Sequence, residues 1–198
     1  SQYRVRDLEL RVPQNCVYGF LGPNGAGKST TIKLLLGLLR PTSGEIYFFG
    51  QKMNEKNQLS ILRNTGSLIE SPSFYGHLTG LENLQIVAKL KKVSASEIEK
   101  VLHTVRLYDQ RNKQGKQYSP GMKQRLGISM ALLGNPKVLF LDEPTNGLDP
   151  AGIQEIRELI RNLPITHQMT VIVSSHLLNE VEQMADMVGI IHHGSLIY

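Results

Sequence analysis

The sequence predicts an α/β fold with a mostly parallel sheet, an N-terminal antiparallel β portion and an inserted α-helical subdomain. Short apolar runs alternate with amphipathic segments in both the first and the last third of the chain, which is the rhythm of a parallel sheet covered by helices. Residues 80–133 lie between these parts and have helical periodicity with few strand signals. The length of 198 residues suits one domain with a full core.

The first elements are a β portion and a strand–helix pair. The run YRVRDLELRV, residues 3–12, alternates polar and apolar side chains as a strand does. Val17–Leu21 is apolar and ends at a Gly-Pro pair, so it predicts a buried strand, and residues 29–39 predict the helix that follows. After the turn RPTSGE we expect a strand at residues 46–49. Residues 51–65 are polar and predicted as mostly helical or irregular.

The remaining elements define the domain organisation. We expect helices in the insert at residues 81–90, 95–107 and 121–133. Strands are then expected at residues 137–141, 169–174 and 187–192, and helices at residues 151–162 and 177–184. We therefore predict a single domain over residues 1–198, truncated at both ends. Its α/β core, with the β portion, is expected over residues 1–75 and 134–198, and its helical subdomain, which would carry YSPGM, over residues 76–133.

Composition narrows the possible partners. The net charge is +5, but the basic residues are scattered and form no dense block beyond Lys89, Lys91 and Lys92, so we expect no nucleic-acid partner. The single cysteine, Cys16, excludes an internal disulfide and lies in an apolar run, which indicates a buried structural thiol. No stretch approaches 18 consecutive apolar residues, so we do not expect the chain to cross a membrane by itself.

The segment GPNGAGKST matches the phosphate-loop pattern G-x-x-x-x-G-K-[ST] and falls between a predicted strand and a predicted helix. Its glycines allow successive backbone N–H groups to surround an anion at a helix N-terminus. Lys28 supplies a charge to the β- and γ-phosphates, and the Ser29 hydroxyl is suited to Mg²⁺. The sequence thus predicts a P-loop NTPase core that binds a nucleoside triphosphate and Mg²⁺ through Gly22, Pro23, Asn24, Gly25, Ala26, Gly27, Lys28, Ser29 and Thr30.

Two carboxylates and a histidine follow predicted strands. In an open parallel sheet, ligands lie beyond the carboxyl ends of the strands. Asp142 is therefore expected to face Mg²⁺ through its water shell, and Glu143 to activate an attacking water. His176 follows the strand TVIVSS and is expected to hydrogen-bond the γ-phosphate or that water. The histidines expected to have no catalytic role are His77, His103, His167, His192 and His193.

The segment YSPGMKQR allows two interpretations. Ser119 and Pro120 have the positions of an N-cap and a first helical residue, which would explain the segment as an ordinary helix start. A helix N-terminus also binds anions, so the segment could instead contact a phosphate. The residues alone do not decide between the two.

The order of these motifs resembles the nucleotide-binding domains of ABC transporters, and the resemblance covers nearly the whole chain. It implies that residues 1–75 and 134–198 form a catalytic, RecA-like core. It implies that YSPGM is the signature motif, in which Ser119 and Gly121 bind ATP held by the phosphate loop of a second copy. It also implies that Asn146–Asp149 forms the loop that couples the two sites, with Asp149 near the nucleotide, that Glu143 is the general base and that His176 is the switch histidine. The implied partners are a second copy, forming a homodimer, and an integral membrane permease that holds the chain at the cytoplasmic face of the membrane.

The chain departs from the family pattern at two places. The usual signature is Leu-Ser-Gly-Gly-Gln, and here Tyr118, Pro120 and Met122 replace three of its residues. The family normally has a Gln, as Mg²⁺ ligand and lever to the permease, near the position of Glu70. A glutamate there resembles the subgroup of lantibiotic-immunity and bacitracin-resistance transporters, which implies export of a peptide antibiotic. The alternative is that Glu70 is a neutral local variant.

Two other functions are compatible with parts of the sequence. A soluble ATPase of the same superfamily could act on nucleic acid or the ribosome, although such proteins usually carry two cassettes or long coiled-coil insertions. A nucleotide-binding regulator without hydrolysis is disfavoured by the presence of Glu143.

Overall fold

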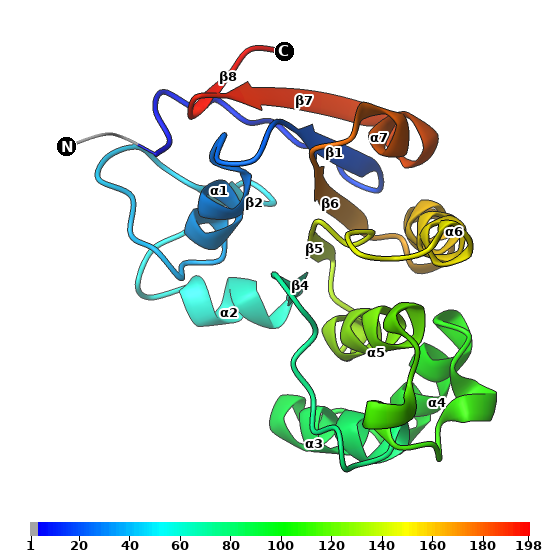
Figure 1. Cartoon of the computed structure of the whole chain (residues 1–198). Coiled ribbons are helices and arrows are strands. Elements are labelled where there is room, and N and C mark those ends of the chain that lie inside the picture. Colours follow the sequence, from blue (N-terminus) through cyan, green and yellow to red (C-terminus); the bar gives the residue numbers. More distant parts are fainter. Residues whose placement is uncertain (1–3) are drawn as a thin grey trace.

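A six-stranded sheet runs through the molecule in the order β4-β5-β6-β1-β7-β8 (Figure 1). The structure is a computed structural model and describes residues 4–198. The strands of this sheet are β1 (Val17–Leu21), β4 (Thr65–Leu68), β5 (Val138–Asp142), β6 (Thr170–Ser175), β7 (Met187–His192) and β8 (Ser195–Leu196). The strands β4, β5, β6, β1 and β7 pair in parallel, each with the next in this order, whereas β8 pairs antiparallel with β7. A separate antiparallel pair joins β2 (Tyr47–Phe48) to β3 (Gln51–Lys52). The predicted α/β class is confirmed.

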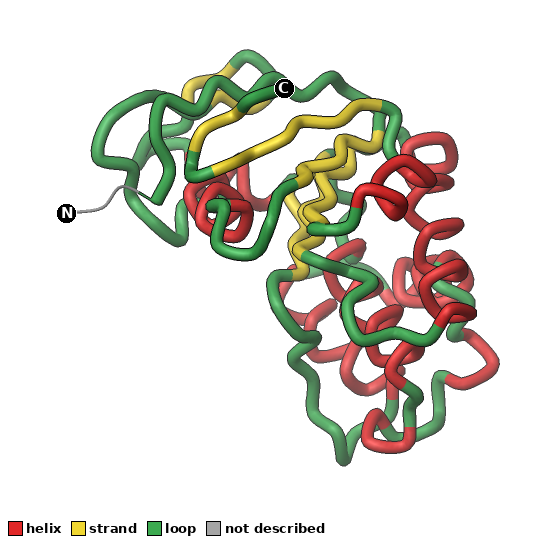
Figure 2. The backbone as a smooth tube through the Cα atoms, turned by 45° about the horizontal axis from the view of Figure 1, so that its top comes forward, coloured by secondary structure: helices red, strands yellow, loops and turns green. Residues whose placement is uncertain are grey.

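Helices cover both faces of the sheet. They are α1 (Lys28–Leu35), α2 (Gln58–Arg63), α3 (Gly80–Lys91), α4 (Ala95–Thr104), α5 (Pro120–Leu132), α6 (Pro150–His167) and α7 (Leu178–Met184), with 3-10 turns at Tyr108–Gln110 and Gly115–Gln117. In Figures 1 and 2, α3, α4 and α5 lie together beyond the β4 edge. The division of the chain into a core and a helical subdomain stays a prediction. Within residues 4–198, no helix is both long enough and apolar enough to span a bilayer.

The strands bury side chains on both faces because apolar residues occupy successive positions. In β5, Phe140 packs with Ile32 of α1 in one core cluster, whereas Leu139 and Leu141 pack with Ile156 of α6 in the other. The strands β1, β5 and β6 are buried along their entire length. This packing fixes the carboxyl ends of the three strands next to one another.

The predicted strand at residues 3–12 is wrong. Residue 3 lies outside the described residues, and residues 4–12 contain no strand. A single backbone hydrogen bond joins this segment to the β7–β8 turn, from Arg6 N to Gly194 O at 2.8 Å. Its alternating apolar side chains Leu8, Leu10 and Val12 instead pack on the α1 side of the core. The alternation therefore reflects one-sided burial of a segment that does not pair as a strand.

Several other elements differ from the predictions: β3 and β8 were not predicted, and α4 ends at Thr104 instead of residue 107. Helix α1 ends at Leu35 instead of residue 39, because Gly37, two residues after this end, adopts a left-handed φ of 66°. Helix α6 continues to His167 through Pro164, which lies in its interior. Strand β4 was not predicted, because its sequence TGSL has neither a long apolar run nor clear alternation. The buried, free thiol predicted for Cys16 is confirmed.

A glycine in β1 allows α7 to approach the sheet closely. A Cβ added to Gly19 would lie 2.3 Å from Val181 Cγ1 and 3.0 Å from Ala185 Cβ. We expect Gly19→Ala to lower the free energy of unfolding by about 1–3 kcal/mol through overpacking, measured by urea unfolding. Adding Val181→Ala should recover part of that loss. An unchanged midpoint in the single variant would contradict this close approach.

Candidate nucleotide site

The phosphate loop joins the carboxyl end of β1 to the N-terminus of α1. Gly25 and Gly27 have left-handed φ values of 81° and 114°, and Gly27 is the N-cap of α1. A Cβ on Gly25 would meet no atom within 4 Å, so this part of the loop is open, whereas a Cβ on Gly27 would lie 2.8 Å from Arg4 O. These left-handed glycines produce the turn that directs backbone N–H groups toward an anion at a helix start.

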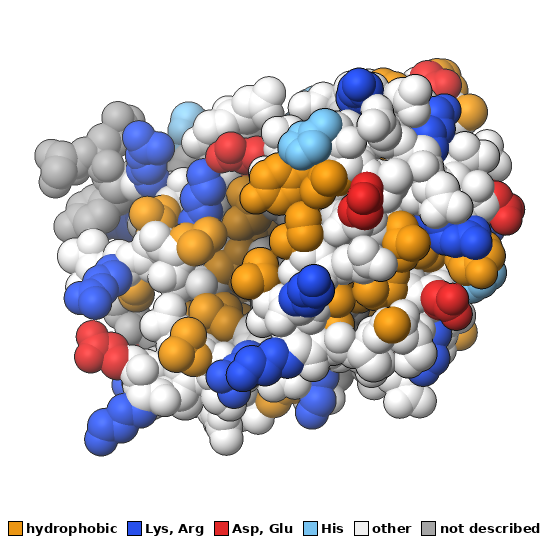
Figure 3. Space-filling model, turned by 90° about the horizontal axis from the view of Figure 1, so that it is seen from below, with side chains coloured by type: hydrophobic (Ala, Val, Ile, Leu, Met, Phe, Trp, Pro, Cys, Tyr) orange, Lys and Arg blue, Asp and Glu red, His pale blue; other side chains and the backbone are white. Residues whose placement is uncertain are grey.

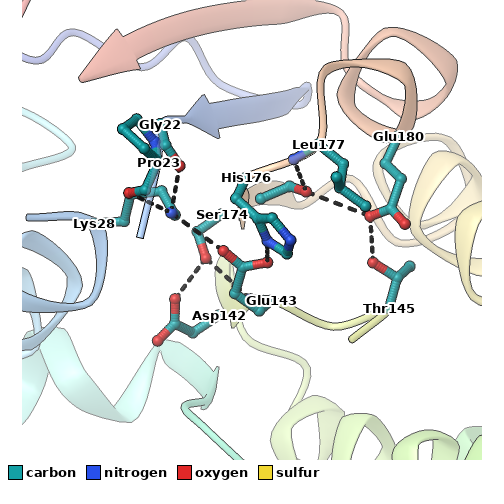
Figure 4. A network of polar contacts seen from close by, with 11 residues as sticks. Gly22, Pro23, Lys28, Asp142, Glu143, Thr145, Ser174, His176, Leu177 and Glu180 are labelled. Carbon is teal, nitrogen blue, oxygen red and sulfur yellow. Dashed lines mark hydrogen bonds and ion pairs between the residues drawn. The ribbon is translucent and has the colours of Figure 1, made fainter. Parts of the chain in front are cut away.

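Lys28 is buried, and only 5% of its surface is exposed. Its ammonium group donates hydrogen bonds to Gly22 O at 2.6 Å and to Pro23 O at 3.3 Å, and it forms an ion pair with Glu143 Oε1 at 3.2 Å (Figure 4). Desolvation of the ammonium is therefore offset by two carbonyls and one carboxylate. The lysine of the phosphate loop and the carboxylate of the β5 end are in direct contact.

Glu143 also contacts His176, at the end of the neighbouring strand. Its Oε2 lies 2.8 Å from His176 Nδ1, so the carboxylate is shared between the lysine and the histidine (Figure 4). The backbone of Glu143 is left-handed, with a φ of 49°, and its N–H donates to Ser174 O at 3.2 Å and to Ser174 Oγ at 3.0 Å. A non-glycine residue keeps such a conformation only when its surroundings hold it.

Asp142 ends β5 and is 4% exposed. Its Oδ1 accepts a hydrogen bond from Ser174 Oγ at 2.5 Å. None of the ion pairs in the described part of the chain includes Asp142. A buried carboxylate without a cation, beside the phosphate loop, suits a hard metal ion that also takes hydroxyl and water ligands.

Glu70 lies apart from this group. It follows β4 with a left-handed φ of 63°, is largely exposed and forms an ion pair with Lys33 of α1, with 2.9 Å between Nζ and Oε1. No three acidic, histidine or cysteine side chains among the described residues cluster as a metal site. The role of Glu70 as a Mg²⁺ ligand therefore stays a prediction.

The signature-like segment forms a capped helix start. Ser119 is the N-cap of α5, and its Oγ accepts a hydrogen bond from Met122 N at 3.3 Å, with Pro120 at the first helical position. Asp149 caps α6 in the same manner, accepting from Gly152 N at 3.1 Å. A Cβ on Gly121 would come within 3.8 Å of Gly152 Cα. The two helix starts therefore lie next to each other, and nucleotide contacts of Ser119, Gly121 and Asp149 stay predictions.

The structure adds polar residues that sequence reasoning missed. Ser174 bonds both Asp142 and Glu143, and a second network joins Thr145, Ser175 and Glu180. The signal available in the sequence was the strand TVIVSS, which ends in two serines immediately before His176. Buried hydroxyls at a strand end require hydrogen-bond partners, and here they find carboxylates.

Comparison with protein-family models matches residues 5–146 to the family described as ABC transporter. The chain belongs to the ABC transporter family. It has the ATP-binding domain of this family. The resemblance inferred from the order of the motifs is therefore confirmed. The phosphate loop, the β5 carboxylates and the segment before α5 all lie within the matched residues.

Curated relatives narrow the subgroup within the ABC transporter family. The chain is 52% identical over 198 residues to the bacitracin transport ATP-binding protein BcrA of Bacillus licheniformis, which covers all of this chain and 64% of BcrA. It is 45% identical over 193 residues to the lantibiotic transport ATP-binding protein SrtF of Streptococcus pyogenes, covering 98% of this chain and 82% of SrtF. The chain thus spans less than two thirds of the length of BcrA.

Solved ABC transporter structures have the same fold. The structure of cbiO1 from Clostridium perfringens, part of the ABC transporter complex cbiONQ, superposes with a TM-score of 0.92 at 27% identity, covering 98% of this chain and 80% of that one. The dimeric ATP-binding cassette MJ0796, in a post-hydrolysis state bound to ADP and Pi, superposes with a TM-score of 0.84 at 26% identity, covering 99% and 89%.

Proposed function

We propose that this chain binds and hydrolyses ATP as a dimer of two copies and drives an ABC transporter that exports a peptide antibiotic. The observation that carries the proposal is the contact of Lys28, Glu143 and His176 beside the phosphate loop. The ATP-binding relatives named for bacitracin and lantibiotic transport support the transported class. The dimeric MJ0796 cassette with ADP and Pi supports shared sites.

Binding starts at the phosphate loop. Backbone N–H groups of the loop and of the α1 N-terminus surround the phosphates, and Lys28 turns from Glu143 to the β- and γ-phosphates. The Ser29 hydroxyl and the Asp142 carboxylate would hold Mg²⁺, and Glu70, which is now paired with Lys33, would be a further oxygen ligand. Mg²⁺, when bound, acts as a Lewis acid that neutralises charge developing on the phosphate oxygens.

Hydrolysis uses the carboxylate that Lys28 leaves. Glu143 accepts a proton from the attacking water as general base, and His176 hydrogen-bonds the same carboxylate and orients the water and the γ-phosphate. Because Glu143 contacts both Lys28 and His176, ATP binding and activation of the base are linked: phosphates that attract the lysine free one carboxylate oxygen for the water.

The second copy completes each site. The α5 N-terminus, with the Ser119 hydroxyl and the close backbone approach at Gly121, binds the γ-phosphate held by the other phosphate loop. Asp149, at the adjacent start of α6, carries the state of one site toward the other. The two interpretations of YSPGMKQR are then compatible, because helix capping by Ser119 and phosphate binding both use the N-terminus of α5.

A membrane permease is the third component. Figure 3 shows hydrophobic side chains gathered on the face seen from below, with Lys and Arg side chains nearby. Large apolar side chains that are more than half exposed include Leu59 on α2, Tyr75 before α3 and Leu90 on α3. We propose that the permease docks on the segment after Glu70 and holds the chain at the cytoplasmic face of the membrane. Exposed apolar surface of this kind marks interaction sites.

The proposal is tested by the rate of ATP hydrolysis per chain against protein concentration. We expect the rate per chain to rise with concentration, because each site needs two copies. Ser119→Ala should lower the rate at high concentration about tenfold or more, by removing a donor to the γ-phosphate. The matched control is Thr79→Ala, which removes the N-cap of α3, with a similar loss of about 1 kcal/mol in stability, and should leave the rate unchanged.

Two results would contradict the dimer. One is a rate per chain that does not depend on concentration. The other is equal activity of Ser119→Ala and Thr79→Ala, which would make Ser119 an ordinary helix cap.

A further inference from the structure

A buried carboxylate without a cation lies behind Glu143 and His176. Glu180 of α7 is 5% exposed, and none of the ion pairs found within residues 4–198 includes it. Its Oε2 accepts hydrogen bonds from Thr145 Oγ1 at 2.5 Å and from Ser175 Oγ at 3.3 Å (Figure 4). An ionised carboxylate is seldom buried unless such bonds satisfy it, so the two hydroxyls explain why Glu180 is tolerated there.

The two hydroxyls belong to the two loops that hold the reacting groups. Thr145 comes two residues after Glu143 and directly before the Asn146–Asp149 loop that leads into α6. Ser175 comes directly before His176, and its Oγ also accepts a hydrogen bond from Leu177 N at 3.0 Å, so it holds the chain on both sides of the histidine. A single oxygen of Glu180 thus joins the loop after Glu143 to the loop that contains His176.

This connection supports a conformation that the backbone does not favour. Glu143 is left-handed, with a φ of 49°, and its N–H is held by Ser174. Thr145 fixes the chain on the other side of Glu143. The 2.8 Å contact between Glu143 Oε2 and His176 Nδ1 lies between these two anchors (Figure 4). Strained conformations persist at functional sites when several contacts determine them together.

We propose that Glu180 is a positioning residue that keeps His176 in hydrogen-bond distance of Glu143 and makes the His176 loop and the Asn146–Asp149 loop move together. The inference rests on the proposed roles of Glu143 and His176. Since Asn146–Asp149 leads from Thr145 to the start of α6, a displacement of His176 reaches that loop through Ser175, Glu180 and Thr145.

A simpler role for Glu180 would be to fix α7 on the sheet. Helix α7 already packs there through Val181 and Met184, which are buried, and Val181 fills the space above Gly19. Val181→Ala is therefore the matched control, because it loosens α7 without touching the polar network. If Glu180 only anchored the helix, the two substitutions would affect turnover in proportion to their losses of stability.

The first measurement compares kcat and KM for ATP. We expect Glu180→Ala to lower kcat about 10- to 100-fold through misplacement of Glu143 and His176, with KM nearly unchanged. Glu180→Gln should retain most of the activity, because its amide oxygen accepts the same two hydrogen bonds. Val181→Ala should lower the melting temperature and keep kcat. Thr145→Val, which removes one of the two hydroxyls, should lower kcat as Glu180→Ala does. It replaces Glu180→Ala as the test if Glu180→Ala does not fold.

The second measurement is the ¹⁵N spectrum of the His176 ring in nucleotide-free protein. The Nδ1 resonance should change in Glu180→Ala and Thr145→Val and stay unchanged in Val181→Ala and Glu180→Gln. This readout needs no turnover, so a wild type that hydrolyses no ATP would refute the proposed function and still leave the positioning testable. An unchanged resonance with unchanged kcat in Glu180→Ala, or an equal kcat loss in Val181→Ala, would overturn the inference.

Discussion

Glu143→Gln is expected to lower kcat for ATP hydrolysis at least about 100-fold, as loss of a general base does. The glutamine keeps the shape of the side chain but accepts no proton at neutral pH. The glutamine also carries no charge. In the wild type, Lys28 lies 3.2 Å from the Glu143 carboxylate and must give up this ion pair to bind the phosphates, whereas in the variant it has no ion pair to lose. ATP should therefore bind several-fold more tightly to the variant, and dimers should accumulate with bound ATP.

The measurements are steady-state hydrolysis, equilibrium binding of ATP and size-exclusion chromatography with ATP present. Glu182→Gln, an exposed carboxylate on α7, controls for the general loss of one negative charge and should behave as wild type. Turnover above about a tenth of wild type in Glu143→Gln would be too high for loss of the general base. Weaker ATP binding would show that the Lys28 ion pair does not compete with the phosphates.

Lys28→Ala is expected to weaken ATP binding about 100-fold, because a buried cation that pairs with phosphate oxygens is lost. The nucleotide-free protein should also lose about 1–3 kcal/mol of stability, since Gly22 O loses a donor and Glu143 loses its cation. Isothermal titration gives the first effect, and urea unfolding without nucleotide gives the second.

The control for this variant is Lys91→Ala. Lys91 of α3 also donates to a backbone carbonyl, Leu133 O at 2.7 Å, but lies in the helical group away from the phosphate loop. We expect it to lose stability without losing affinity for ATP. If both lysine variants bind ATP with the affinity of the wild type, Lys28 only holds the loop, and the phosphate loop is not the nucleotide site.

The predictable parts of the fold were those encoded in contiguous residues. Val17–Leu21 and Met187–His192 were predicted with the bounds that the structure has, because short, mostly apolar runs ended by turn residues mark strands of a parallel sheet. The phosphate loop was equally local. Residues 4–12 were misinterpreted because one-sided burial produces the same alternation as a strand, and whether the segment finds a pairing edge depends on the rest of the sheet.

The contacts within the candidate site required the three-dimensional structure. Sequence placed Lys28, Asp142, Glu143 and His176 at one edge of a sheet, since they follow parallel strands. It did not show that Lys28 pairs with Glu143, which depends on the orientation of two side chains 115 positions apart. Glu180 was missed entirely, because an acidic residue in the sequence NEVEQ indicates an exposed helix face. Only its position over the ends of β5 and β6 buries it.

The sheet order has a consequence for synthesis on the ribosome. Strand β1 (Val17–Leu21) precedes every other strand of the sheet, yet both of its neighbours, β6 and β7, come from residues 170–192. Until residues 170–192 emerge, the fully buried β1 has neither of its partner strands, and Lys28 has been translated long before its counter-ion Glu143. Non-local pairing of this kind forms late and leaves apolar strands exposed to aggregation. The nascent chain therefore carries its phosphate loop without the sheet that shapes it until residues 170–192 have been made.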